Sequence, residues 1–191
     1  MNLVLYWLVK IIGTPLFYLI FWPKFVNKNN IPKDGPIILA GNHKSNFDCA
    51  FLVCSTNRVV HFLAKKELLE TKIKWFFKGM GIIPVDRKNK NPKALEDAIK
   101  NLKENNVIGI FPEGTRNKSK DVILPFKYGA VKMASETNCY IVPFSITGKY
   151  RIFGKLTITF GKPYKVGNDL EKENKILMEK VSNLIKGEYN E

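Results

Sequence analysis

Cysteine is scarce in this 191-residue sequence. Its three cysteines, Cys49, Cys54 and Cys139, are odd in number and form no C-x-x-C pair. This pattern argues against a disulfide framework or a zinc site and fits a protein of the reducing cytosol. Nothing in the sequence calls for a metal ion or another cofactor. At this length, one domain can bury a sufficient core without such support.

Acidic residues are also few, at 17 against 31 lysines and arginines, which leaves a formal net charge of +14. Such a charge attracts nucleic acid, an anionic membrane surface or an acidic substrate carrier. The sequence has no recognised nucleic-acid motif, and its densest aromatic cluster is apolar, so no nucleic-acid partner is expected. Arginines are rare among the cations. They indicate a phosphate-binding site better than the lysines do, because the planar guanidinium group suits phosphate.

No apolar run reaches the roughly 20 residues that a straight membrane-spanning helix needs. The segment from Met1 to Trp22 is nearly all apolar, with Lys10 as its single charge, but Gly13-Thr14-Pro15 interrupts it. The aromatic content predicts a membrane-associated helical segment over residues 1–30 that inserts at the interface or re-enters. The alternative is an N-terminal core helix that covers a sheet.

From Pro36 onward, β-like apolar runs alternate with helical patterns, which predicts one α/β domain over residues 31–191 with a largely parallel, mixed central sheet flanked by helices. The proline at position 143 suggests an edge strand or a bulge. In such a fold, ligands collect at the carboxyl ends of the strands. The expected strands are Ile37 to Ala40, Val59 to Ala64, Ile82 to Val85, Val107 to Phe111, Tyr140 to Ile146 and Leu156 to Phe160, and apolar faces at 94–102 and 170–184 mark two helices.

One of only two histidines, His43, follows the first of these strands and stands five residues before Asp48. The two would not share a face of one continuous helix. A turn after Gly41, with Ser45 as the N-cap of the next helix, would bring them together. Asp48 could then orient the imidazole as a general base. The plainer alternative is that Asp48 only caps the helix.

Three further polar clusters lie where the rule on strand ends would place a site. Arg87 comes just after the strand that ends at Val85, residues 112–116 follow the strand that ends at Phe111, and the strand from Tyr140 carries residues 142–148. Taken singly, Arg87, Glu113 and Arg116 could be ordinary loop residues. Together with His43 they repeat one layout, in which a strand end carries a phosphate-suited or acid-base group. The other histidine, His61, lies within an apolar strand and is expected to be structural.

Four segments in this order resemble the glycerolipid acyltransferases of the PlsC type, the 1-acyl-glycerol-3-phosphate acyltransferase family. Residues 42–48, N-H-K-S-N-F-D, are similar to the N-H-x-x-x-x-D block of that family. Residues 81–87 resemble its second block, a glycine and an arginine separated by five mostly apolar residues. F-P-E-G-T-R at 111–116 matches the third block throughout, and V-P-F at 142–144 resembles the fourth.

This resemblance implies acyl transfer from a thioester of acyl carrier protein or coenzyme A to the sn-2 hydroxyl of lysophosphatidic acid, giving phosphatidic acid. His43 would be the base and Asp48 its orienting acid, and Asn42 or nearby backbone amides are unassigned candidates for stabilising the oxyanion. The residues implied for binding the acceptor phosphate and its glycerol are Arg87, Glu113, Gly114, Thr115, Arg116 and, more weakly, Lys65.

The resemblance also implies a location at the cytoplasmic face of the cell membrane, through Met1 to Trp22. Two alternatives stay open from the sequence. One is an acyltransferase for another acceptor, such as glycerol 3-phosphate or a different lyso-lipid. The other is a non-catalytic basic protein that binds lipid or membrane.

Overall fold

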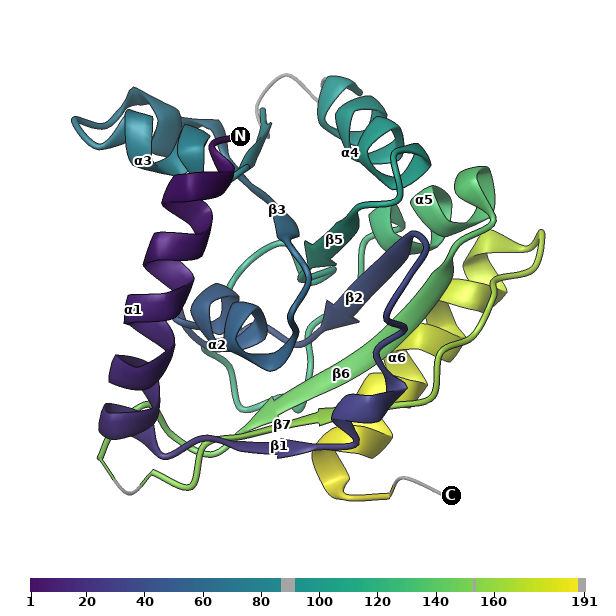
Figure 1. The fold of residues 1–191 in the computed structure, drawn as a ribbon. Helices are drawn as coiled ribbons and strands as arrows, with labels where there is room; N and C mark the ends of the chain where they lie inside the picture. Colours follow the sequence, from purple (N-terminus) through teal and green to yellow (C-terminus); the bar gives the residue numbers. More distant parts are fainter. Residues whose placement is uncertain (87–91, 153, 189–191) are drawn as a thin grey trace.

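The computed structural model describes residues 1–86, 92–152 and 154–188. Its centre is a seven-stranded sheet in the order β1-β7-β6-β2-β5-β3-β4 (Figure 1). All neighbouring strands pair in parallel except β6 and β7, which are antiparallel. The strands are β1 Lys24–Val26, β2 Ile37–Gly41, β3 Val60–Lys65, β4 Ile83–Val85, β5 Val107–Ile110, β6 Tyr140–Thr147 and β7 Thr157–Phe160.

Helices cover both faces of this sheet, because successive side chains of a buried strand point to opposite sides. Ile37 and Leu39 of β2 pack towards α1 and α2, whereas Ile38 and Ala40 pack towards α4, α5 and α6 (Figure 1). The single-domain α/β prediction is confirmed. The helices are α1 Leu3–Phe21, α2 Asp48–Ser55, α3 Lys74–Gly79, α4 Lys93–Lys103, α5 Gly129–Thr137 and α6 Leu170–Lys186, with short 3-10 turns at Lys28–Asn30 and Lys66–Glu70.

The N-terminal segment differs from its predicted form, because α1 continues without a break through Gly13 and Pro15. Among the described residues it is the one helix long and apolar enough to cross a membrane, judged by length and composition alone. One side packs on the domain, where the buried Tyr6 hydroxyl accepts a hydrogen bond from the Val60 N–H at 3.0 Å and Lys10 donates to the Thr56 carbonyl. The packed side stabilises a helix that Pro15 alone would weaken.

Pro143 lies in β6, which is a central strand, so the expectation of an edge strand was wrong. Its carbonyl accepts a hydrogen bond from the Gly161 N–H at 2.8 Å, one residue beyond the end of β7 at Phe160. The N–H and C=O groups of one strand residue point to the same side. The carbonyl of Pro143 points towards the chain just beyond β7, so the N–H that proline lacks would also have pointed there and not towards β2. The proline therefore leaves the β2–β6 pairing intact.

Candidate active site

The predicted site residues follow the carboxyl ends of parallel strands. His43 comes two residues after β2, Glu113 comes three residues after β5, and Lys65 is the last residue of β3. Because β2 pairs with β5 and β5 pairs with β3, all in parallel, these three strand ends meet at one edge of the sheet. Arg87, two residues beyond the end of β4 in the sequence, lies outside the described residues, and its neighbour Asp86 forms an ion pair with Lys66 at 2.7 Å.

A tight turn joins His43 to Asp48, as the sequence predicted, but α2 begins at Asp48 and its N-cap is Phe47 instead of Ser45. The carboxylate of Asp48 reaches back over the turn. Its Oδ2 atom accepts the backbone N–H groups of Lys44 at 2.6 Å and Ser45 at 2.8 Å. These bonds hold the turn ahead of α2; they differ from a capping box, in which the third helical residue accepts the N–H of the N-cap. The turn and the contact with His43 therefore use the same oxygen.

The imidazole of His43 is held on two sides. Its Nδ1 atom lies 2.7 Å from Oδ2 of Asp48, which is fully buried. Its ring stacks on Phe111, with centroids 4.2 Å apart and planes 14° apart. A carboxylate accepts from Nδ1–H, and the neutral ring then carries its lone pair on Nε2. No described residue hydrogen-bonds to Nε2, and 18% of the side chain is exposed, so this nitrogen can meet a substrate.

The backbone of His43 is fixed as well, from the segment that follows β5. Its N–H donates to Oε1 of Glu113 at 2.6 Å, and its carbonyl accepts from the N–H of Asn117 at 2.7 Å. The other oxygen of Glu113 accepts from the N–H of Leu124 at 2.9 Å. Glu113 is buried, and desolvation raises its pKa, while the two N–H groups that it accepts oppose that rise. Both of its oxygens are therefore occupied by main chain.

The end of the third block, F-P-E-G-T-R at 111–116, is exposed at Thr115 and Arg116. Gly114 has φ +68°, and a Cβ there would meet the Lys127 side chain at 2.9 Å. Thr115 and Arg116 are exposed at this edge, as is Lys65 at the end of β3. Lys127 was not foreseen as a site residue, because it lies outside the four motifs and nothing in its local sequence marks it. The ammonium groups and the guanidinium give this edge several cations suited to phosphate.

Asn42, a candidate for oxyanion stabilisation, has both ends of its amide engaged. Its Nδ2 donates to the carbonyl of Ile146 at 3.0 Å, and its Oδ1 accepts the N–H of the same residue at 2.7 Å. Asn42 thus continues the pairing of β2 with β6 beyond Gly41 by using its side chain. This arrangement uses Oδ1 and one of the two Nδ2 hydrogens, so the pairing with β6 fixes the side chain.

An apolar cavity of about 250 Å³ lies at the start of α2, and neither His43 nor Asp48 lines it. It lies between α1, α2, α3 and β3, and it includes Asn46 and Cys49, the neighbours of the α2 start. Aromatic and aliphatic side chains form most of its wall. The lining residues are Tyr6, Val9, Lys10, Gly13, Thr14, Phe17, Asn46, Cys49, Ala50, Val53, Cys54, Val60, Phe62, Phe76, Phe77, Met80 and Ile82.

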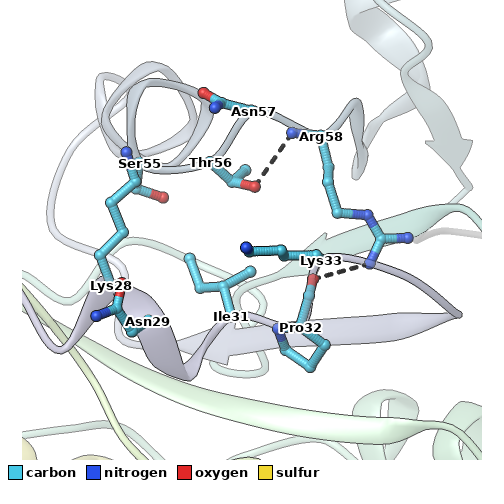
Figure 2. A pocket seen from close by; sticks show the side chains of 9 residues that line it. All are labelled: Lys28, Asn29, Ile31, Pro32, Lys33, Ser55, Thr56, Asn57 and Arg58. Carbon is cyan, nitrogen blue, oxygen red and sulfur yellow. Dashed lines mark hydrogen bonds between the residues drawn. The ribbon is translucent and has the colours of Figure 1, made fainter.

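A larger cavity, of about 890 Å³, lies at the other end of α2 and contains no predicted site residue (Figure 2). Arg58 stands at its side but is committed to structure: its guanidinium donates to the carbonyls of Pro32 at 3.2 Å, Gly35 at 2.5 Å and Asn105 at 2.9 Å. The predicted structural role of His61 agrees with its burial and with a 3.1 Å contact from Nδ1 to the Gly81 carbonyl.

A histidine whose Nε2 has no described partner, backed by a buried aspartate and near an apolar cavity at the start of α2, is suited to general-base chemistry on a partly apolar substrate. The family model described as Acyltransferase matches residues 23–147. This match covers more than half of the sequence, and the chain therefore belongs to the acyltransferase family. The family resemblance inferred from the four motifs is confirmed.

Individual relatives agree with the family. The chain is 38% identical over 147 residues to a 1-acyl-sn-glycerol-3-phosphate acyltransferase of Bacillus subtilis, covering 73% of this chain and 72% of that protein. It is 36% identical to one from Borreliella burgdorferi, over 66% of this chain and 51% of the relative. The crystal structure of the acyltransferase PlsC from Thermotoga maritima matches with TM-score 0.76 and 25% identity, over 94% of this chain and 77% of that one.

Proposed function

We propose that this chain transfers an acyl group from a thioester to the sn-2 hydroxyl of 1-acyl-glycerol-3-phosphate, giving phosphatidic acid. The observation that supports this most directly is the pairing of His43 with Asp48 at 2.7 Å, with Nε2 unpartnered among the described residues. The acyl acceptor follows from the relatives, which carry that activity in their names. The apolar cavity at the start of α2 supports a lipid substrate.

In the proposed reaction, Nε2 of His43 takes the proton of the 2-hydroxyl as its oxygen attacks the thioester carbonyl. Asp48 keeps Nδ1 protonated and stabilises the imidazolium that forms. The tetrahedral intermediate then collapses, the carbon–sulfur bond breaks, and the imidazolium returns the proton to the thiolate. The hydroxyl oxygen is the nucleophile, so no acyl-enzyme is formed, in keeping with a sequence that has no G-x-S-x-G elbow.

The acceptor phosphate is proposed to bind the cations at the same edge. Arg116 and Lys65 are exposed there, and we retain Arg87 in this role on its sequence position alone. Lys127 joins them because its side chain lies against Gly114. Thr115 and Gly114 are proposed to shape the glycerol-phosphate pocket.

We assign Glu113 to positioning instead of direct binding of substrate. Each of its oxygens accepts a backbone N–H, from His43 and from Leu124. A carboxylate so occupied has little capacity left for a ligand, whereas it fixes the main chain that carries the base.

The apolar cavity is proposed to receive an acyl chain. Its wall is formed in part by α1, whose other side exposes apolar residues to the surroundings. We propose that residues 1–30 form the membrane-associated segment and residues 31–191 the catalytic domain. With one side packed on the domain, α1 suits a position lying in the membrane interface. The exposed apolar residues of α1 include Leu3, Val4, Trp7, Leu8, Ile11, Ile12, Leu16 and Leu19.

The acyl donor is proposed to be a thioester of acyl carrier protein or coenzyme A, both of which are anionic and suit a chain of charge +14. Both donors are cytosolic, which places the proposed site of action at the cytoplasmic face of the cell membrane.

A panel of acceptors and donors tests the proposed function. Purified protein on vesicles is given lysophosphatidic acid or glycerol 3-phosphate, each with both thioesters, and the lipid product is identified by mass spectrometry. We expect phosphatidic acid from lysophosphatidic acid, and its loss in His43→Ala with vesicle binding retained. Turnover of His43→Ala near the wild-type rate would overturn the mechanism, and a preference for glycerol 3-phosphate would reassign the acceptor.

A further inference from the structure

Tyr150 contacts the proposed catalytic pair from a distant part of the chain. It follows β6 in the loop that begins at Gly148, and its hydroxyl donates to Oδ1 of Asp48 at 2.5 Å. The other carboxylate oxygen, Oδ2, receives the contacts from His43, Lys44 and Ser45. Among the described residues, Tyr150 is the one hydrogen-bond donor to Oδ1.

The phenol of Tyr150 stays protonated and so acts as a donor. Burial and the adjacent Asp48 carboxylate both raise the pKa of Tyr150 far above its usual value. A hydrogen bond from a neutral hydroxyl to a carboxylate is charge-assisted and strong. The bond therefore defines how the buried carboxylate is turned about its Cβ–Cγ axis.

The ring of Tyr150 is itself held by aromatic neighbours. Phe21, the last residue of α1, meets it edge-on with centroids 5.6 Å apart. Phe47, the N-cap of α2, lies 6.0 Å away and also contacts Phe21. The loop is fixed nearby, because Lys44 donates from its ammonium to the Gly148 carbonyl at 2.8 Å. The hydroxyl is thus directed at Asp48 by packing on two separate helices.

We propose that Tyr150 is a positioning residue for the reaction, which locks the Asp48 carboxylate so that Oδ2 faces Nδ1 of His43. The inference rests on the proposed function for its kinetic consequence. Without the hydroxyl, Oδ1 is a buried acceptor with no described partner, and the carboxylate is held through Oδ2 alone. The imidazole then spends less time in the orientation that presents Nε2 to the acceptor hydroxyl.

Tyr150→Phe isolates the hydroxyl, because the ring and its contacts with Phe21 and Phe47 remain. Loss of a hydrogen bond to a charged group predicts a fall in kcat of about 10- to 100-fold, with the KM for lysophosphatidic acid unchanged. Tyr128→Phe, at an exposed tyrosine, is the matched control and should keep the wild-type kcat. Tyr150→Leu should lose the same factor in kcat and also unfold at a lower temperature.

A second measurement needs no substrate. Diethyl pyrocarbonate modifies unprotonated imidazole, and mass spectrometry follows its rate at His43 across pH. Removing the phenol donor leaves more negative charge on Asp48 to hold the protonated ring. The midpoint of this rate should therefore move to higher pH in Tyr150→Phe, and the acidic limb of kcat/KM should move with it.

The kinetic and the modification measurements test the role of Tyr150 and the proposed function separately. A wild-type midpoint and kcat in Tyr150→Phe would overturn the role of Tyr150, whatever the substrate. A shifted midpoint in a protein that acylates no acceptor would support the contact and overturn the proposed function instead.

Discussion

Glu113→Gln separates two roles for the third motif, namely contact with the acceptor and support of the His43 backbone. Glutamine has the same shape as glutamate, but its amide accepts a hydrogen bond with only one of its two terminal atoms. In the wild-type protein both terminal oxygens accept buried or half-buried N–H groups, from His43 and from Leu124. The amide NH₂ of glutamine must therefore face one of these N–H donors.

The loss of stability in Glu113→Gln can be estimated from that one unpaired N–H donor. A buried donor without a partner costs about 1–3 kcal/mol. For a domain of this size, a loss of 1 kcal/mol lowers Tm by roughly 2–4 °C. We therefore expect Glu113→Gln to melt about 2–12 °C below the wild type. If the displaced donor is the His43 N–H, kcat falls while the KM for the acceptor changes little.

The assay is thermal unfolding followed by fluorescence in detergent micelles, paired with steady-state kinetics on mixed micelles. Glu136→Gln, at a half-exposed glutamate of α5, is the matched control and should keep its Tm and kcat. The reasoning would be refuted by a Glu113→Gln protein with wild-type Tm and kcat but a raised KM for lysophosphatidic acid. That result would return Glu113 to direct contact with the acceptor.

Three other outcomes test the scaffold. Arg58→Lys should lower the free energy of unfolding by about 1–3 kcal/mol, measured by urea titration, because an ammonium group cannot reach three carbonyls arranged for a planar fork. Burial lowers the pKa of His61, so stability should fall as pH drops below about 6.5 towards that lowered value, and Tm of His61→Gln should depend less on pH. On α1, Ile12→Lys should weaken vesicle flotation without changing Tm, whereas Tyr6→Lys should lower Tm, because Ile12 is 68% exposed and Tyr6 is fully buried.

The sequence predicted the sheet well, because its buried strands are continuous apolar runs bounded by turn residues. It missed β1, since Lys24–Val26 is only three residues long and is recognised as a strand only through its pairing with β7. It predicted an edge strand or a bulge at β6 because Pro143 lacks a donor, and the sequence does not show which side of the strand that donor would have faced. Tertiary packing likewise overrode the expected break in α1.

For the candidate site too, the sequence predicted some residues and could not predict others. His43 and Asp48 were found because they are close in sequence and a turn was foreseeable between them. Tyr150 could not be found, because its contact with Asp48 spans 102 positions along the chain. Glu113 was placed in the right cluster, but the sequence could not show that main-chain N–H groups occupy its carboxylate. Lys127 meets Gly114 only through the fold of the segment between β5 and α5.

The position of β2 at the centre of the sheet has a consequence for biosynthesis. Its partners β5 and β6 begin at residues 107 and 140, so the ribosome must make most of the chain before the central strand can pair on both sides. Such distant pairings also slow folding. By then α1 has already been synthesised, and the unfinished domain does not yet cover its apolar surface. A nascent chain that meets the bilayer at this stage would fold on the membrane surface.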